Sequence, residues 1–262
     1  MIAARERAPR VLVMMVTLVA VGRHVGLASL AGIMAGVLIG GVLGRVAMRI
    51  SGFTAGPILA GARTSNDNVV GDITFAGTLA LIVFVGVGSG LLGGLAYAIV
   101  EPWVRRFRPW HGLAYGLGLL GAAGSLVLDP SNLDFSAFGS APLNIAMFAA
   151  LFVLFGVAIA LVFDRLRRTA GSAGTIARTV TGLGWLALLL AVVLAGSAAI
   201  SSGVNAILLL LFVLPLAIAA VVRWRGLPSP IGYGALAVPV LFGGVQTIGG
   251  LPRLLTGLLI GF

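Results

Sequence analysis

The sequence predicts an all-α protein, a polytopic bundle of about seven transmembrane helices. Of its 262 residues, 60% are hydrophobic and only 9% are charged, and the mean hydropathy is +1.15. A water-soluble chain of this size cannot bury so much apolar surface, because surface grows almost as fast as mass. The apolar residues also fall into runs of about 20, the length that a helix needs to cross a bilayer.

Seven apolar runs are predicted to cross the bilayer and to form a single transmembrane domain over residues 25–262. No segment between them has room for a water-soluble domain. The seventh run contains Pro239 and Gln246, which makes it the least regular. The predicted spans are residues 25–48, 73–100, 112–128, 143–163, 182–200, 204–222 and 231–250.

Residues 1–24 form a basic, interfacial N-terminal segment. Its apolar run, residues 11–22, is too short to span and follows Arg5, Arg7 and Arg10. These features are also typical of a cleavable signal peptide. Cleavage would start the chain outside the cell and reverse the arginine distribution described next. We therefore favour an interfacial helix or an extension of the first span.

The arginines predict the orientation. All 17 basic residues are arginine. An N-terminus in the cytoplasm places 13 of them on the inner side and only Arg45, Arg49 and Arg63 outside, with Arg253 past the last span. This is the distribution of the positive-inside rule, and it predicts a multi-pass plasma-membrane protein. The net charge of +10 then faces anionic lipid headgroups, so we expect membrane lipids and no nucleic acid as partners.

Glycine recurs every four residues in the first spans, as in a glycine zipper. A four-residue step places the glycines on one helix face, where a second backbone can approach closely. We therefore expect spans one to three to form the centre, and similar rows suit docking of other membrane subunits or of a second copy. The rows are Gly32, Gly36, Gly40 and Gly44, then Gly86, Gly90 and Gly94, and in the third span Gly112, Gly116, Gly121 and Gly124.

The second, fourth and sixth spans end in a similar way. Glu101 precedes Arg105 and Arg106 in the second span, and Asp164 precedes a run of arginines in the fourth. One interpretation is a duplicated helical hairpin. The other is that any helix running inward carries arginines at its cytoplasmic end.

The candidate binding site lies on the outer side. Arg45 and Arg49 are four residues apart, so they share a helix face. Asp72, Asp129 and Asp134 lie in the outer loops and are the expected partners. One interpretation is a structural ion network that fixes these loops. The other is a vestibule for an anion or a lipid headgroup, which paired guanidinium groups suit.

No cofactor or metal site is expected. The absence of cysteine excludes thiolate metal sites and iron–sulfur clusters. His24 and His111 are the only histidines, and both are predicted to face lipid headgroups at the inner interface rather than to bind haem or metal. Asn144 and Gln246 are expected to form hydrogen bonds between helices.

The sequence leaves two main functional hypotheses, and neither is an enzyme. A membrane enzyme is a third hypothesis, disfavoured by the shortage of acid–base groups. The chain has no lysine for a retinal Schiff base, no His-Glu-x-x-His motif and no Walker A motif. The first hypothesis is binding or passage of a small solute, ion or lipid through the outward-facing arginine–aspartate cluster. The second is a non-catalytic accessory subunit of a larger membrane complex. A transporter should have a polar path near Gln246 or a broken helix, whereas a subunit should have no continuous cavity.

Overall fold

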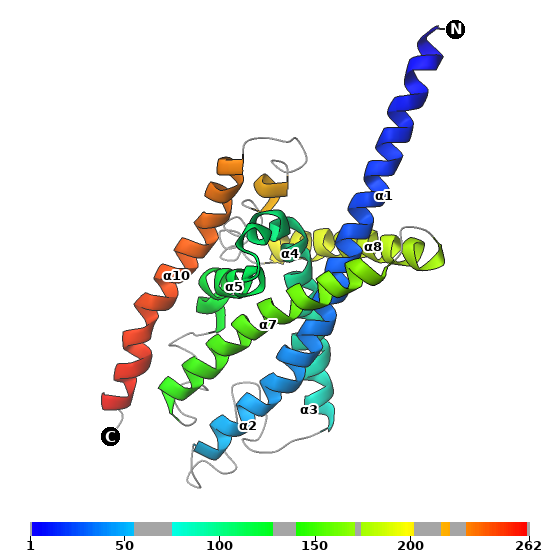
Figure 1. Cartoon of the computed structure of the whole chain (residues 1–262). Coiled ribbons are helices and arrows are strands. Elements are labelled where there is room, and N and C mark those ends of the chain that lie inside the picture. Colours follow the sequence, from blue (N-terminus) through cyan, green and yellow to red (C-terminus); the bar gives the residue numbers. More distant parts are fainter. Residues whose placement is uncertain are drawn as a thin grey trace.

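The computed structural model confirms the predicted fold class. It describes residues 2–54, 75–127, 140–170, 174–201, 216–220 and 229–260. Within these ranges every regular element is a helix, and no strand is present (Figure 1). The chain is therefore an all-α membrane protein.

The N-terminal helix is the longest element. It runs through α1 (Ile2–Gly36), the π-helical segment η1 (Val37–Leu43) and α2 (Gly44–Thr54). Residues 11–22 belong to α1, so they are helical and continuous with the first predicted span. Its apolar part, Met14–Thr54, has 41 residues. At about 1.5 Å per residue, this part is about 60 Å long, twice the hydrocarbon core of about 30 Å.

Helices stand at six of the seven predicted spans, and the sixth, residues 204–222, lies mostly outside the described residues. Among the described residues, four stretches are long and apolar enough to cross a membrane: Met14–Thr54, Gly77–Phe107, Ala141–Thr169 and Pro230–Pro252. The remaining elements, in chain order, are α3 (Phe75–Ala80), η3 (Leu81–Ser89), α4 (Gly90–Val104), η4 (Arg105–Phe107), α5 (His111–Val127), α7 (Ala141–Thr169), α8 (Thr175–Ser201) and α10 (Ser229–Ile260).

The glycine rows of α1 and α4 face each other. A Cβ atom added to Gly36 would lie 2.7 Å from the Gly90 Cα, and one added to Gly90 would lie 3.1 Å from the Gly36 Cα. One turn further, a Cβ on Gly94 would lie 2.9 Å from the Ser29 Cα. Side chains have no room at these positions, because the two backbones themselves are in contact. The predicted role of these rows in helix packing is confirmed.

The predicted centre needs a correction, since α7 and α8 pack against α1 and α5 does not, although α5 adds the buried Tyr115 to the shared core. The core combines Ala28 and Ala31 of α1 with Tyr97 of α4 and with Phe163 of α7, all of them buried. The glycines of α5 pack elsewhere, mainly on α7 and α10. Regular glycine spacing predicts that a face is a contact face, but it does not name the helix that it contacts.

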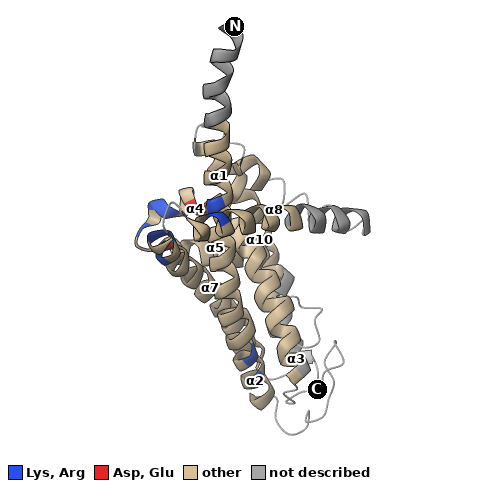
Figure 2. Cartoon of the chain, turned by 90° about the vertical axis from the view of Figure 1, so that its right-hand side faces the viewer, with Lys and Arg blue, Asp and Glu red and all other residues tan. Residues whose placement is uncertain are grey.

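Helix α8 crosses α1 instead of running beside it, as both views show (Figures 1 and 2). The crossing is close, because a Cβ added to Gly184 would lie 2.7 Å from the Gly26 nitrogen. Above it, α1 projects out of the bundle, and its side chains from Met14 to Val21 are exposed.

Candidate functional site

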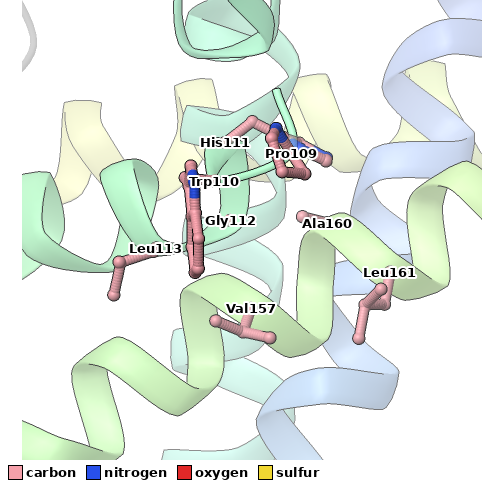
Figure 3. A pocket seen from close by; sticks show the side chains of 8 residues that line it. All are labelled: Pro109, Trp110, His111, Gly112, Leu113, Val157, Ala160 and Leu161. Carbon is pink, nitrogen blue, oxygen red and sulfur yellow. The ribbon is translucent and has the colours of Figure 1, made fainter. Parts of the chain in front are cut away.

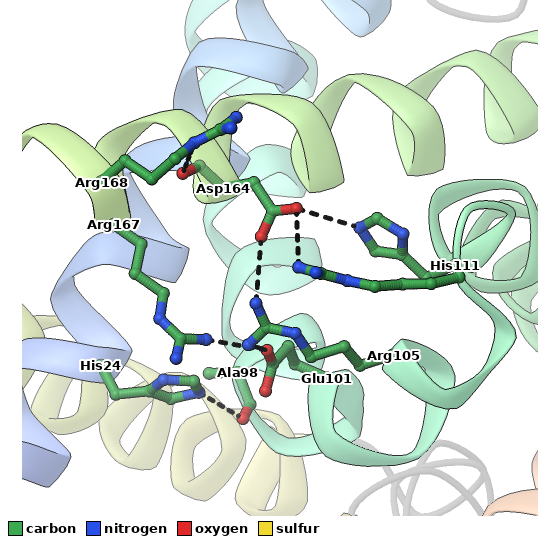
Figure 4. Close-up of polar contacts among 9 residues, drawn as sticks. His24, Ala98, Glu101, Arg105, His111, Asp164, Arg167 and Arg168 are labelled. Carbon is green, nitrogen blue, oxygen red and sulfur yellow. Dashed lines mark hydrogen bonds and ion pairs between the residues drawn. The ribbon is translucent and has the colours of Figure 1, made fainter.

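The described arginines form two groups, one on α2 and one at the opposite end of the bundle (Figure 2). Charged side chains from the last turns of α4 and α7 meet there, beside the turn that leads into α5 (Figure 4). We call this second group the inner ionic cluster, after the side on which the arginine distribution places it. Its members are Glu101, Arg105, Arg108, His111, Asp164 and Arg167.

Glu101 joins α4 to α7. Its side chain is only 7% exposed, although it carries a carboxylate group. Nη1 of Arg105, one turn further along α4, donates a hydrogen bond of 2.7 Å to the Glu101 Oε1. Nη1 of Arg167 on α7 lies 3.6 Å from the same oxygen. Burial of a carboxylate is costly unless it is paired, and two guanidinium groups meet that requirement here.

Asp164 joins α7 to the turn between α4 and α5. Its Oδ1 lies 3.6 Å from the Arg105 Nη2. Its Oδ2 accepts a hydrogen bond of 3.2 Å from the Arg108 Nη2 and lies 3.6 Å from the His111 Nε2. The cluster thus contains two carboxylates and three guanidinium groups, so it carries net positive charge.

The two histidines do not face lipid headgroups, and that prediction is wrong. The His24 Nε2 lies 3.0 Å from the Ala98 carbonyl oxygen, and its ring packs edge-on against Phe163. His111 is 9% exposed, and neither ring nitrogen has a hydrogen-bond partner among the described residues. Both residues lie between helices. Helix α1 continues past His24, and α7 continues past His111. Within the described ranges, no three histidine or acidic side chains lie together as a metal site.

The predicted outer cluster is only partly within the described residues. The Arg45 Nε and Nη2 donate hydrogen bonds of 3.3 and 3.1 Å to the Thr78 Oγ1 of α3. The guanidinium carbon of Arg49 lies 5.4 Å from the centroid of the Phe53 ring. Arg45 is thus joined to the second span through a hydroxyl group. The other predicted site residues, Asp72, Asp129 and Asp134, lie outside the described residues, so their contact with Arg45 and Arg49 stays a prediction.

This geometry predicts different effects for the two arginines. We expect Arg45→Gln to lower the free energy of unfolding by about 1 kcal/mol, because it removes the hydrogen bonds to Thr78. Arg49→Gln should change it by less than about 0.5 kcal/mol, because Arg49 is exposed. Chemical unfolding in detergent measures both. Equal losses of stability for the two variants would contradict a stabilising role of the hydrogen bonds between Arg45 and Thr78.

The two polar residues expected within spans behave differently. Asn144 is 2% exposed and accepts a hydrogen bond from the Ser51 hydroxyl, which joins α7 to α2. Gln246 is exposed on α10 instead of lying between helices. Helix α10 also continues through Pro239 without a break.

Comparisons with known proteins assign no family. No protein-family model matches the chain, and no curated protein and no solved structure matches it.

The inner ionic cluster was not predicted as a site from the sequence. Glu101 and Asp164 were considered only as parts of similar span ends. The useful signal is that both spans run in the same direction and place an acidic residue one helical turn before arginines. When two such helix ends lie at the same membrane depth, the acidic residue of one helix can form an ion pair with an arginine of the other.

Proposed function

We propose that this chain is a plasma-membrane protein that works as a non-catalytic subunit of a larger membrane assembly, docking through the projecting part of α1. The observation that carries the proposal is the exposed apolar surface of α1 beyond the bundle. Its large apolar side chains there, each at least 40% exposed, are Met14, Met15, Val16, Leu18, Val19 and Val21.

The position of this surface argues for a partner. The side chains are almost consecutive, so they cover all sides of the helix, and such a helix belongs in apolar surroundings. The inner ionic cluster belongs near the water boundary, because ionised groups are costly within the hydrocarbon core. The exposed part of α1 extends past the α8 crossing at the end of the bundle where the second group of charged residues lies (Figure 2). A partner helix or apolar groove would supply the missing cover.

Three features favour a subunit over a transporter. The backbones of α1 and α4 are in contact at Gly36 and Gly90, which leaves no path between these helices. Gln246 is exposed on α10 instead of facing other helices. Helix α10 is not broken at Pro239. The first feature closes the space between α1 and α4, and the second leaves Gln246 outside the bundle interior, where a solute would need polar groups.

Photo-crosslinking tests the proposal. We expect a photoreactive residue at Val16 or Val19 of the full chain to crosslink to one defined membrane protein, or to a second copy, in native membranes. The matched control is Val245 on α10, which is 70% exposed and apolar. In addition, Val16→Gln should release the partner without lowering the melting temperature. Lipid adducts alone at all three positions would refute the docking surface.

A second candidate function rests on Arg49. Its guanidinium group is exposed and lies over the Phe53 ring at the outer end of α2, where an anion could reach it. Binding or passage of a small anion or a lipid headgroup at the outer end, with Arg45, Asp72, Asp129 and Asp134 around it, therefore stays a proposal. Loss of a bound anion or lipid in Arg49→Gln, without loss of stability, would support it.

Docking through glycine zippers also stays a proposal. The rows of α1 and α4 are used inside the chain, as Gly36 and Gly90 show. Most of the glycines left open lie on α10, where an added Cβ at Gly234, Gly244 or Gly249 would meet nothing within 4 Å; Gly118 of α5 and Gly182 of α8 are also open.

A further inference from the structure

A groove lies between the start of α5 and the second half of α7 (Figure 3). It has a volume of about 270 Å³ and an almost wholly apolar lining. Its lining residues include Trp110 and Leu113 on one side and Val157, Ala160 and Leu161 on the other. Pockets that enclose a whole small molecule measure about 300–1,000 Å³. The groove is therefore suited to one part of a longer molecule, such as a stretch of acyl chain.

Cationic groups stand directly beyond the apolar lining. On α7, Arg165 follows Leu161 by four residues and Arg168 follows it by seven, so all three share one helix face. All three are exposed. On the other side of the groove, Arg108 precedes the lining residue Pro109, and its side chain is 52% exposed. On both sides of the groove, positive charge thus lies at the end of the apolar lining nearest the inner ionic cluster.

These guanidinium groups have more N–H donors than the hydrogen bonds to Asp164 use. Arg108 uses one hydrogen bond for Asp164, and a guanidinium group has five N–H donors. The side chain of Arg165 is exposed at the same end. Trp110 is 67% exposed at the level between the apolar and the charged surface. Tryptophan is enriched at this depth of a bilayer, where headgroups begin.

We propose that this groove binds an anionic phospholipid. An acyl chain lies along Leu113, Val157 and Leu161, and the phosphate accepts hydrogen bonds from Arg108 and Arg165. Arginine forks suit phosphate oxygens better than point charges do. Basic sites between transmembrane helices at the cytoplasmic side bind such headgroups. Asp164 is shared between Arg105 and Arg108, and Glu101 pairs with Arg105 and Arg167. The two carboxylates are therefore outnumbered, and with Arg165 and Arg168 exposed beside it the groove mouth keeps its positive charge.

Native mass spectrometry of the full-length protein tests the proposal. The protein is purified in mild detergent and offered phosphatidylglycerol or phosphatidylcholine at equal concentration. We expect the wild type to retain phosphatidylglycerol at least tenfold better. Combining Arg108→Gln with Arg165→Gln should remove most of this preference. Leu161→Trp, a change at a side chain that is 64% exposed, should block the groove and weaken retention of phosphatidylglycerol about tenfold.

Two matched controls separate the site from general surface attraction. Leu154→Trp lies on the same face of α7 but outside the groove lining, and it should leave retention unchanged. Arg178→Gln removes an exposed arginine from α8, which does not line the groove. Equal loss in Arg178→Gln and in the double variant would overturn the proposal, as would equal retention of both lipids by the wild type.

Inorganic phosphate separates a lipid site from a free-anion site. We expect phosphate at millimolar concentration to leave phosphatidylglycerol bound, because the acyl chain supplies part of the affinity. Complete displacement by phosphate, together with no effect of Leu161→Trp, would overturn the lipid assignment in favour of a free anion. Should the arginine double variant fail to fold, Leu161→Trp and its control at Leu154 decide the question, since both positions are exposed.

Discussion

Replacing Gly90 with leucine is expected to lower the free energy of unfolding by more than about 3 kcal/mol, which is at the upper end of the cost of overpacking. The Cβ alone would lie 3.1 Å from both the Gly32 carbonyl carbon and the Gly36 Cα. These are backbone atoms, so they cannot move aside as a flexible side chain does. The two helices must separate, and the packing of Ala28 and Ala31 beside them is then lost. Unfolding in detergent, followed by circular dichroism, measures the loss.

Gly118→Leu is the matched control. Gly118 lies within α5, and an added Cβ there meets nothing within 4 Å. Leucine has a better helix propensity than glycine by about 0.8 kcal/mol, so this variant should be as stable as the wild type or slightly more stable. Gly90→Ala should fall between the two. Equal melting temperatures for Gly90→Leu and Gly118→Leu would contradict the close approach of α1 and α4.

The helices could be predicted from the sequence because a bilayer makes their requirement local. Each span must satisfy its own backbone hydrogen bonds and expose apolar side chains, and both conditions can be read within about 20 residues. The contact face of α1 was predicted for the same reason, because the spacing of Gly32 and Gly36 defines a face of one helix. Its partners could not be read this way. The sequence does not say that α7 lies beside α1, since that depends on how all helices pack together.

The inner ionic cluster shows the same limit. The arginines at the ends of α4 and α7 were placed on one side of the membrane by their number alone. Their pairing with Glu101 and Asp164 depends on the distance between two helices, which no local pattern contains. The histidines were misplaced for a related reason. Their position near span ends predicts exposure only if the helix ends there, whereas α1 continues well past His24.

Glu101→Gln is expected to lower the free energy of unfolding by about 1–3 kcal/mol. The substitution keeps the shape of the side chain but removes its charge, which leaves Arg105 and Arg167 without their nearest carboxylate. Breaking a fully buried pair from one side costs about 3–5 kcal/mol. Here the side chains of Arg105 and Arg167 are 28% and 50% exposed, so water replaces part of the lost interaction and the loss is smaller.

A double-mutant cycle separates this interaction from other effects of the substitution. We expect Glu101→Gln combined with Arg105→Gln to cost about 1 kcal/mol less than the sum of the two single variants, because the stability effects of substitutions at residues in direct contact do not add.

The control is Arg168→Gln. Arg168 is exposed at the same end, and its Nε donates only to the backbone oxygen of Asp164 within the described part of the chain. Its loss should change stability by less than about 0.5 kcal/mol. Strict additivity of Glu101→Gln and Arg105→Gln would show that the hydrogen bond of 2.7 Å between these side chains does not stabilise the bundle. The link between α4 and α7 would then rest on the apolar core alone.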